Sequence, residues 1–139
     1  MAGKVKHAFQ YLWQWPEFVY GLWKLSCLKQ PIVSVFGGKR ASQESHIFKQ
    51  AFELGKKLIE ADFSVITGGG PGIMEATLCG ALSTGQKQRA LGITVRGVDE
   101  PTAPLCERET VYLSNFATRK WLLMYYSRAY VIFPGGIGT

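Results

Sequence analysis

Short apolar runs alternate with longer amphipathic segments along most of the chain. Residues 32–36 form a β-branched run, Ile-Val-Ser-Val-Phe, that ends at Gly37 and Gly38. This pattern predicts a buried strand of a parallel sheet, followed by a tight turn. From Ile47 to Ile59, apolar residues recur at helical spacing, and lysines and glutamates fill most other positions. An amphipathic helix is therefore expected after the first strand.

The same alternation continues to the end of the sequence. Three further apolar runs predict strands, at residues 63–67, 91–95 and 130–133, and two further helices are expected at residues 73–82 and 116–126. Asn115 is placed to cap the second of these helices. Residues 97–110 contain Gly97, Pro101 and Pro104 and are interpreted as a loop.

Alternating strands and helices are typical of one fold class. They predict an α/β protein over residues 31–139: a Rossmann-like, doubly wound parallel sheet with helices on both faces. Ligands of such sheets bind beyond the carboxyl ends of the strands. All three glycine-rich segments, 37–38, 68–72 and 135–138, follow predicted strands and are expected at that edge.

Residues 1–30 are interpreted as an aromatic-rich helical extension. Pro16 suits the first turn of its helix, with Glu17 at the positive end. We favour packing of this helix on the main domain or on a second subunit. The alternative is binding to a membrane surface, because Trp and Lys together suit an interface. No apolar run approaches the roughly 20 residues needed to span a bilayer, and no membrane partner is expected.

Composition and charge narrow the class of partner. A length of 139 residues suits one domain, and 47% apolar residues suit a globular protein. The formal net charge of +6 favours anionic partners. Lysine and arginine are not densely clustered, so a small phosphorylated ligand is preferred over nucleic acid.

The three cysteines, Cys27, Cys79 and Cys106, lie far apart in the sequence. Their odd number argues against a disulfide framework, and their spacing, with only two histidines, argues against a zinc site. We therefore expect no metal, no disulfide and a reducing, cytoplasmic compartment.

The segment Gly68-Gly-Gly-Pro-Gly72 stands between a predicted strand and a predicted helix. Backbone amides at the start of a helix attract anions, and glycine lets the backbone approach them closely. The alternative is a tight connection without a ligand, but a second glycine-rich turn at 135–138 favours a binding site. Ile73 and Met74 follow Gly72, which excludes a Walker A loop, and the dinucleotide pattern G-x-G-x-x-G also fails. A mononucleotide or sugar-phosphate site remains.

Three stretches together resemble the LONELY GUY (LOG) family, also called lysine decarboxylase-like, over residues 31–139. They are Thr67-Gly-Gly-Gly-Pro-Gly-Ile-Met-Glu-Ala76, Phe116-Ala-Thr-Arg-Lys120 and Ser127-Arg-Ala-Tyr-Val-Ile-Phe-Pro-Gly-Gly-Ile-Gly-Thr139. The form of the motifs and the N-terminal extension resemble the longer bacterial branch of the family.

The resemblance implies hydrolysis of the N-glycosidic bond of a nucleoside 5'-monophosphate, a cytokinin nucleotide or AMP. The products are the free base and ribose 5-phosphate. It implies no cofactor and assembly as a homodimer or larger homo-oligomer. Arg119 matches the catalytic arginine of the family and Lys120 would assist it; a solvated surface charge is the alternative for Arg119. The phosphate would lie between two sets of residues: Gly69, Gly70 and Gly72, and Gly135, Gly136, Gly138 and Thr139. Glu75 is assigned either to the ribose hydroxyls or to stabilising the helix dipole.

The match departs from the family at one point. The family motif continues to a catalytic glutamate three residues beyond the threonine, and this sequence ends at Thr139. We therefore expect a sheet that is incomplete at its C-terminal side and an isolated chain that is a poor enzyme. The alternatives are a non-catalytic nucleotide- or cofactor-binding carrier, or a partner-binding protein that uses the aromatic N-terminus.

Overall fold

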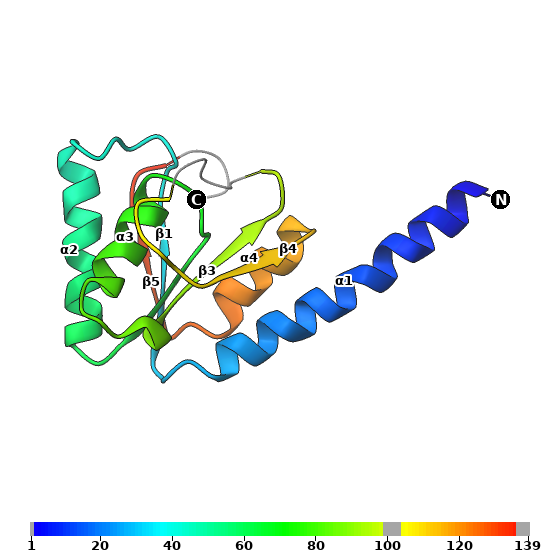
Figure 1. Cartoon of the computed structure of the whole chain (residues 1–139), viewed down its shortest axis with the longest axis horizontal. Helices are drawn as coiled ribbons and strands as arrows, with labels where there is room; N and C mark the ends of the chain where they lie inside the picture. The colour runs from blue at the N-terminus through cyan, green and yellow to red at the C-terminus, as the bar shows by residue number, and fades with distance from the viewer. Residues whose placement is uncertain (1, 99–103, 136–139) are drawn as a thin grey trace.

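A computed structural model describes residues 2–98 and 104–135 of the chain. Five strands form the sheet: β1 (Ile32–Phe36), β2 (Ser64–Thr67), β3 (Ala90–Val95), β4 (Thr110–Leu113) and β5 (Ala129–Ile132). The helices are α1 (Ala2–Ser26), α2 (His46–Glu60), α3 (Ile73–Leu82) and α4 (Phe116–Tyr125), with a short 3₁₀ helix, η1 (Lys87–Arg89). All strand pairs are parallel, in the order β4-β3-β2-β1-β5. The predicted α/β class is confirmed (Figure 1).

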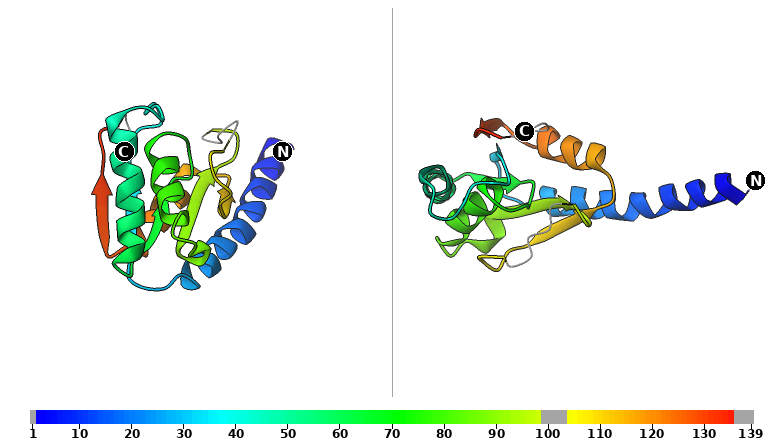
Figure 2. Two further views of the ribbon diagram at one scale, coloured as in Figure 1. Left: turned by 60° about the vertical axis from the view of Figure 1, so that its left-hand side comes forward. Right: turned by 90° about the horizontal axis from the view of Figure 1, so that it is seen from above.

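Helices cover both faces of this sheet, and each face has its own apolar core. Val33 and Val35 of β1 pack with buried residues of α2 and α3, whereas Ile32 packs with buried residues of α1 and α4. Successive residues of a strand point to opposite faces, so a strand buried on both sides must be apolar throughout. Figure 2 shows α2 and α3 on one side of the sheet and α4 on the other.

Ser34 is the polar exception in the apolar run of β1. Its hydroxyl donates to the carbonyl of Leu123 near the end of α4 and lies 2.6 Å from the hydroxyl of Ser127. Because a buried hydroxyl must be hydrogen-bonded, this serine fixes α4 against β1.

Successive strands are added to the sheet first on one side of β1 and then on the other. Strands β2, β3 and β4 extend the sheet to one side of β1, and β5 then pairs with β1 on the other side. The carboxyl ends of β1 and β5 therefore form a topological switch point, where sheets of this class bind ligands.

Helices α2 and α3 approach each other through two glycines. A Cβ at Gly55 would overlap the carbonyl oxygen of Thr77, and a Cβ at Gly80 would overlap that of Phe52. Only glycine permits backbones this close, so these two positions set the distance between α2 and α3.

The structure adds one strand that the pattern did not predict. The interpretation of 97–110 as a loop placed no strand beyond Val95, but Thr110–Leu113 form β4 at the sheet edge. Val111 and Leu113 are buried and Tyr112 is exposed. Four residues with one apolar alternation are too short for a periodicity signal, and pairing with β3 decides their conformation.

The N-terminal helix begins well before Pro16, which therefore lies inside the helix rather than in its first turn as expected. The last turn of α1 packs into the core through Leu25, while its N-terminal half extends away from the sheet (Figure 1). Proline inside a helix removes one backbone hydrogen bond. In the described part of the chain, no helix is long and apolar enough to cross a membrane.

The expectation of no disulfide is wrong. Cys79 of α3 and Cys106 are joined by a disulfide across 27 positions of sequence, and Cys27 is the free, exposed cysteine. The segment that leads to β4 returns along α3 and brings the two Cα atoms to 5.7 Å. The cysteine count therefore gives no indication of the compartment, and a cytoplasmic location stays a prediction.

Asp62 links three segments at the amino-terminal side of the sheet. Its carboxylate accepts hydrogen bonds from Lys29 Nζ at 3.0 and 3.1 Å and from Arg89 Nη2 at 2.6 Å. The Lys29 ammonium, and then the Arg89 guanidinium, hold the pKa of Asp62 below its usual value of 3.8. Asp62 has a φ of 71°, a conformation that Asn also tolerates.

We expect Gly80→Ala to lower the free energy of unfolding by about 3 kcal/mol, because the added methyl group forces α2 and α3 apart. Urea denaturation followed by circular dichroism measures this difference. Gln50→Ala, at an exposed position of α2, is the control and should change stability little. Equal stability of Gly80→Ala and the control would contradict the close helix packing.

We expect Asp62→Asn to remove part of the acid sensitivity of the fold. A carboxyl whose pKa is lowered on folding stabilises the protein above its unfolded pKa, and this contribution is lost as pH falls through the lower, folded value. The stability difference between wild type and Asp62→Asn should therefore be full at neutral pH and shrink below about pH 4. Glu53→Gln, at an exposed site on α2, is the matched control. A difference that stays constant from pH 7 to about pH 2 would refute the linkage.

Candidate nucleotide-binding site

Three turns meet at the carboxyl edge of the sheet. The N–H of Gly38, after β1, donates to the carbonyl of Pro134, after β5, at 3.2 Å. The carbonyl of Gly38 accepts from the N–H of Ile73, at the start of α3, at 3.1 Å. A Cβ at Gly38 would lie 3.1 Å from the Cα of Gly135. The segments 37–38 and 68–72 and the described start of the third segment, Gly135, therefore share one edge as predicted, at the switch point between β1 and β5.

Two side-chain hydrogen bonds to the backbone of Gly69 hold the loop between β2 and α3. The N–H of Gly69 donates to Thr67 Oγ1 at 3.1 Å, and its carbonyl accepts from Arg108 at 3.1 Å. This N–H is therefore occupied, which leaves Gly69 as a shaping residue of the loop. The amides of Gly70 and Gly72 meet no hydrogen-bond acceptor within residues 2–98 and 104–135. Within the described residues, these two amides are candidate donors to an anion beside the positive end of α3.

Arg119 reaches the same loop from the other face of the sheet. Asn115 caps α4, as predicted, by accepting the N–H of Ala117 at 2.6 Å. One turn later, Arg119 Nη2 lies 3.8 Å from the sulfur of Met74, and a Cβ at Gly68 would overlap this nitrogen. The absence of a side chain at Gly68 therefore leaves the space that the guanidinium occupies.

The other predicted site residues lie further from this contact or outside the described residues. Lys120 is next to Arg119 on α4 and is exposed. Gly135 is exposed beside Gly38. Three predicted phosphate ligands, Gly136, Gly138 and Thr139, lie outside the described residues. Within 2–98 and 104–135, no three His, Cys, Asp or Glu side chains are grouped as metal ligands would be.

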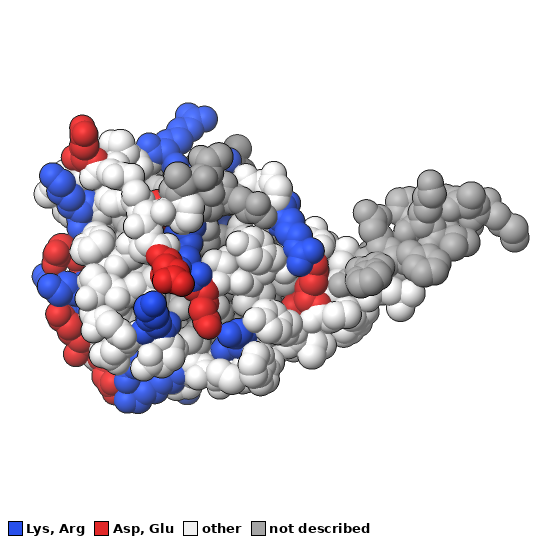
Figure 3. Space-filling view, in the orientation of Figure 1, with Lys and Arg blue, Asp and Glu red and all other residues white. Residues whose placement is uncertain are grey.

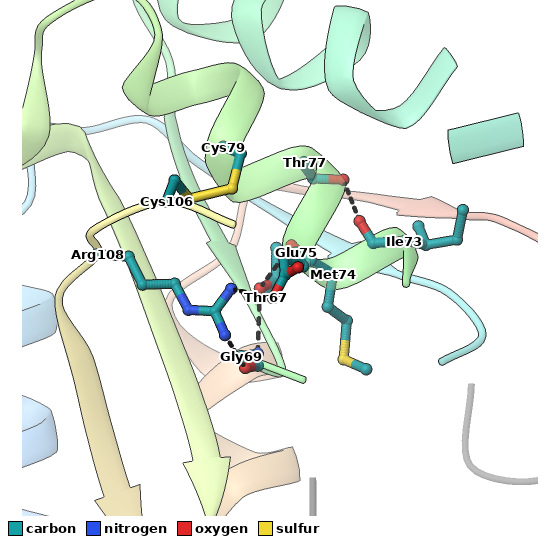
Figure 4. A network of polar contacts seen from close by, with 9 residues as sticks. All are labelled: Thr67, Gly69, Ile73, Met74, Glu75, Thr77, Cys79, Cys106 and Arg108. Carbon is teal, nitrogen blue, oxygen red and sulfur yellow. Dashed lines mark hydrogen bonds and ion pairs between the residues drawn. A yellow bond between two sulfur atoms is a disulfide. The ribbon is translucent and has the colours of Figure 1, made fainter. Parts of the chain in front are cut away.

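Glu75 has a partner that the sequence did not reveal. Its carboxylate accepts from Arg108 Nη1 at 3.1 Å, and both side chains are only 6% exposed. Figure 4 shows the guanidinium between Glu75 and the carbonyl of Gly69. The carboxylate is thus directed at Arg108, and the ribose-binding role of Glu75 stays a prediction. Arg108 stands 33 positions away in a segment without periodicity, so no sequence pattern connects the two.

A separate cavity of about 530 Å³ lies at the amino-terminal side of the sheet, between the end of α1 and the segment before β4. Trp23, Leu28 and Leu91 line it, and the Lys24–Glu109 ion pair, 3.1 Å long, lies in its wall. The Glu109 carboxylate raises the pKa of Lys24.

On the face seen in Figure 3, acidic and basic side chains are interspersed, so the net positive charge forms no single basic surface there. The glycine edge remains the better candidate for an anion site because it supplies backbone amides.

Comparison with known proteins assigns the chain to a family. The model of the SLOG cluster4 family matches residues 30–139. The chain belongs to the SLOG cluster4 family. The resemblance to LOG proteins drawn from the glycine motifs is thereby confirmed.

Curated relatives of this SLOG cluster4 protein include a pyrimidine/purine nucleotide 5'-monophosphate nucleosidase of Escherichia coli strain K12. It is 27% identical over 114 residues, which are 78% of this chain and 25% of the relative. Proteins of the same name from strains O6:H1 and O157:H7 match equally. The chain thus spans about a quarter of the length of these relatives.

Solved structures share the fold at low identity. They include TM1055 (TM-score 0.60, 23% identity, 78% of this chain and 64% of that one) and the Moco carrier protein of Chlamydomonas reinhardtii (0.60, 21%, 79% and 65%). A third is the molybdenum cofactor binding protein of Rippkaea orientalis (0.57, 22%, 79% and 66%). At this identity the likeness shows a common fold.

We expect Gly68→Ala to weaken binding of inorganic phosphate about tenfold. Charge-assisted hydrogen bonds contribute about 1.5–3 kcal/mol, and the added methyl group, which would overlap the Arg119 guanidinium, shifts the glycine loop whose amides would hold the anion. Titration followed by phosphorus NMR measures the affinity. Gly21→Ala in α1, where the nearest atom is the far end of the Leu122 side chain, is the matched control. Unchanged affinity in Gly68→Ala, with the control also unchanged, would show that anion binding does not depend on the shape of the glycine loop.

Proposed function

We propose that this SLOG cluster4 protein hydrolyses the N-glycosidic bond of a nucleoside 5'-monophosphate. The observation that carries the proposal is the contact of the Arg119 guanidinium with Gly68, at the edge where three glycine turns meet. AMP is the substrate on which we base the test; a cytokinin nucleotide has the same ribose 5-phosphate group.

The phosphate is assigned to the glycine turns. The amides of Gly70 and Gly72 and the positive end of α3 favour a dianion at this edge. Gly72 has a positive φ of 75° where the backbone enters α3. Residues with a side chain rarely adopt this conformation, and glycine adopts it readily. Gly135 brings the turn after β5 to the same place. Gly136, Gly138 and Thr139, which lie outside the described residues, are assigned to the same phosphate site from the sequence motif alone.

The chemistry assigned to Arg119 follows from charge. The oxygen of a water molecule bonds to the ribose carbon as the bond to the base nitrogen breaks, and the proton that the water loses ends on the departing base. The products are the free base and ribose 5-phosphate. Negative charge develops on the departing base, and a fixed guanidinium stabilises such charge. Lys120 is proposed to assist. The curated relatives named nucleotide 5'-monophosphate nucleosidases support this reaction class.

A carrier function is the second candidate, and one observation favours it. Glycoside hydrolysis uses a carboxylate at the ring, but Glu75, the acid that follows the glycine loop, is buried and paired with Arg108. Two proteins of the same fold are named for binding or carrying the molybdenum cofactor. A protein that holds a phosphorylated ligand without cleaving it would need the glycine turns alone.

Assembly as a homo-oligomer belongs to the same proposal. Trp121 and Tyr125 of α4 stack at 4.5 Å and are 44% and 67% exposed, and Trp15 and Trp23 of α1 are also exposed. Large aromatic side chains are enriched at protein interfaces. We therefore assign α1 and α4 to contacts between copies of the chain.

The decisive experiment measures adenine and ribose 5-phosphate after incubation of AMP with the protein expressed from its complete gene. We expect release of both products at equal rates. Arg119→Ala should lower kcat/KM on the order of 100-fold, as removal of one charge-stabilising donor does in other enzymes.

Arg128→Gln is the matched control, because Arg128 is exposed at the opposite end of β5. It should retain wild-type rates. Calorimetric binding of AMP without release of adenine would replace hydrolysis by the carrier function. Failure to bind AMP at millimolar concentration would contradict both.

A further inference from the structure

The disulfide and the buried ion pair join the same two segments. Cys79, in the second half of α3, is bonded to Cys106, and Arg108 stands two residues further along. From there the Arg108 side chain returns to Glu75 in the first turn of α3 and to Gly69 in the glycine loop. Figure 4 shows the disulfide and the guanidinium side by side along α3.

The glycine loop depends on these external contacts for its shape. Glycine residues have more conformational freedom than any others, so a run of three does not define its own conformation. Gly69 adopts a φ of 71° and is held on both sides, through its N–H by Thr67 and through its carbonyl by Arg108. Thr67 belongs to β2 and is fixed by the sheet.

Arg108, by contrast, belongs to neither a helix nor a strand. Its backbone lies between the disulfide at Cys106 and the start of β4 at Thr110. The position of the Arg108 guanidinium therefore depends on how firmly this segment is held. Loss of the covalent bond would leave the edge strand and noncovalent contacts of Glu109, with Lys24 and with the N–H of Gly92, to hold that segment.

We propose that Arg108 is a positioning residue for the glycine loop, and that the Cys79–Cys106 disulfide keeps it in place, so that anion binding weakens when the disulfide is reduced. The ligand side of this proposal rests on the proposed function. Reduction by a dithiol transfers two electrons and two protons to the sulfur–sulfur bond. The products are the thiols of Cys79 and Cys106 and the oxidised, cyclic disulfide of the reagent.

Hydrogen–deuterium exchange tests the positioning without any ligand. The Cys27→Ser variant removes the free, exposed thiol and is compared oxidised and after treatment with dithiothreitol. We expect amides of residues 68–75 to exchange about tenfold faster after reduction, as local opening becomes easier. Amides of α2 should not change.

Cys79→Ser/Cys106→Ser in the same background is the matched control for the reductant. It should show the faster exchange at once and no response to dithiothreitol. Unchanged exchange of residues 68–75 in the reduced protein would overturn the role of the disulfide.

Two substitutions separate positioning from charge balance. Arg108→Met removes the donor to Gly69 but leaves the Glu75 carboxylate buried without its partner. Arg108→Met/Glu75→Gln removes both charges and still lacks the donor. We expect exchange of residues 68–75 to be about tenfold faster in both variants, and AMP to bind about tenfold more weakly to both. Arg128→Gln controls for loss of an arginine.

Return of wild-type exchange and AMP affinity in Arg108→Met/Glu75→Gln would show that Arg108 only balances a buried charge, and would overturn the proposal. If the oxidised wild type does not bind AMP, the proposed function fails. The exchange measurements then still decide whether Arg108 and the disulfide position the loop.

Discussion

The two hydrogen bonds of the Gly38 backbone are the constraint on which the rest of the carboxyl edge depends. One joins the turn after β1 to the start of α3, through Ile73, and the other joins it to the turn after β5, through Pro134. Three segments far apart in sequence are thereby held within backbone contact. A Cβ at Gly37 would overlap Ile73. Gly37, Gly68 and Gly72 at this edge are thus required by packing before any ligand is considered.

The doubly wound sheet explains why two different chemical groups meet there. Helix α3 lies on one face and begins with the glycine loop, whereas α4 lies on the other face and carries Arg119 in its first turns. Parallel strands put the start of each following helix at the same edge. Backbone amides and a guanidinium therefore reach one point from opposite sides of the sheet.

The buried ion pair of Glu75 and Arg108 fixes the geometry beside the glycine loop. Burying Glu75 and Arg108 costs desolvation energy, which their mutual contact and the bond to the carbonyl of Gly69 offset. Such a pair gives a specific geometry more than it gives stability. It fixes the carboxylate that follows the glycine loop, and the Cys79–Cys106 disulfide fixes the same two segments.

The sequence by itself determined the strands and helices that have clear periodicity, the cap at Asn115, the shared edge of the glycine turns and the family. These are local patterns, or follow from the rule that parallel strands end at one edge. Only the tertiary structure decided that Thr110–Leu113 form a strand, that Cys79 and Cys106 form a disulfide, and that Arg108 forms an ion pair with Glu75. Each of these depends on a partner between 18 and 33 positions away in sequence. Periodicity carries no information about such partners, because the folded chain alone brings them into contact.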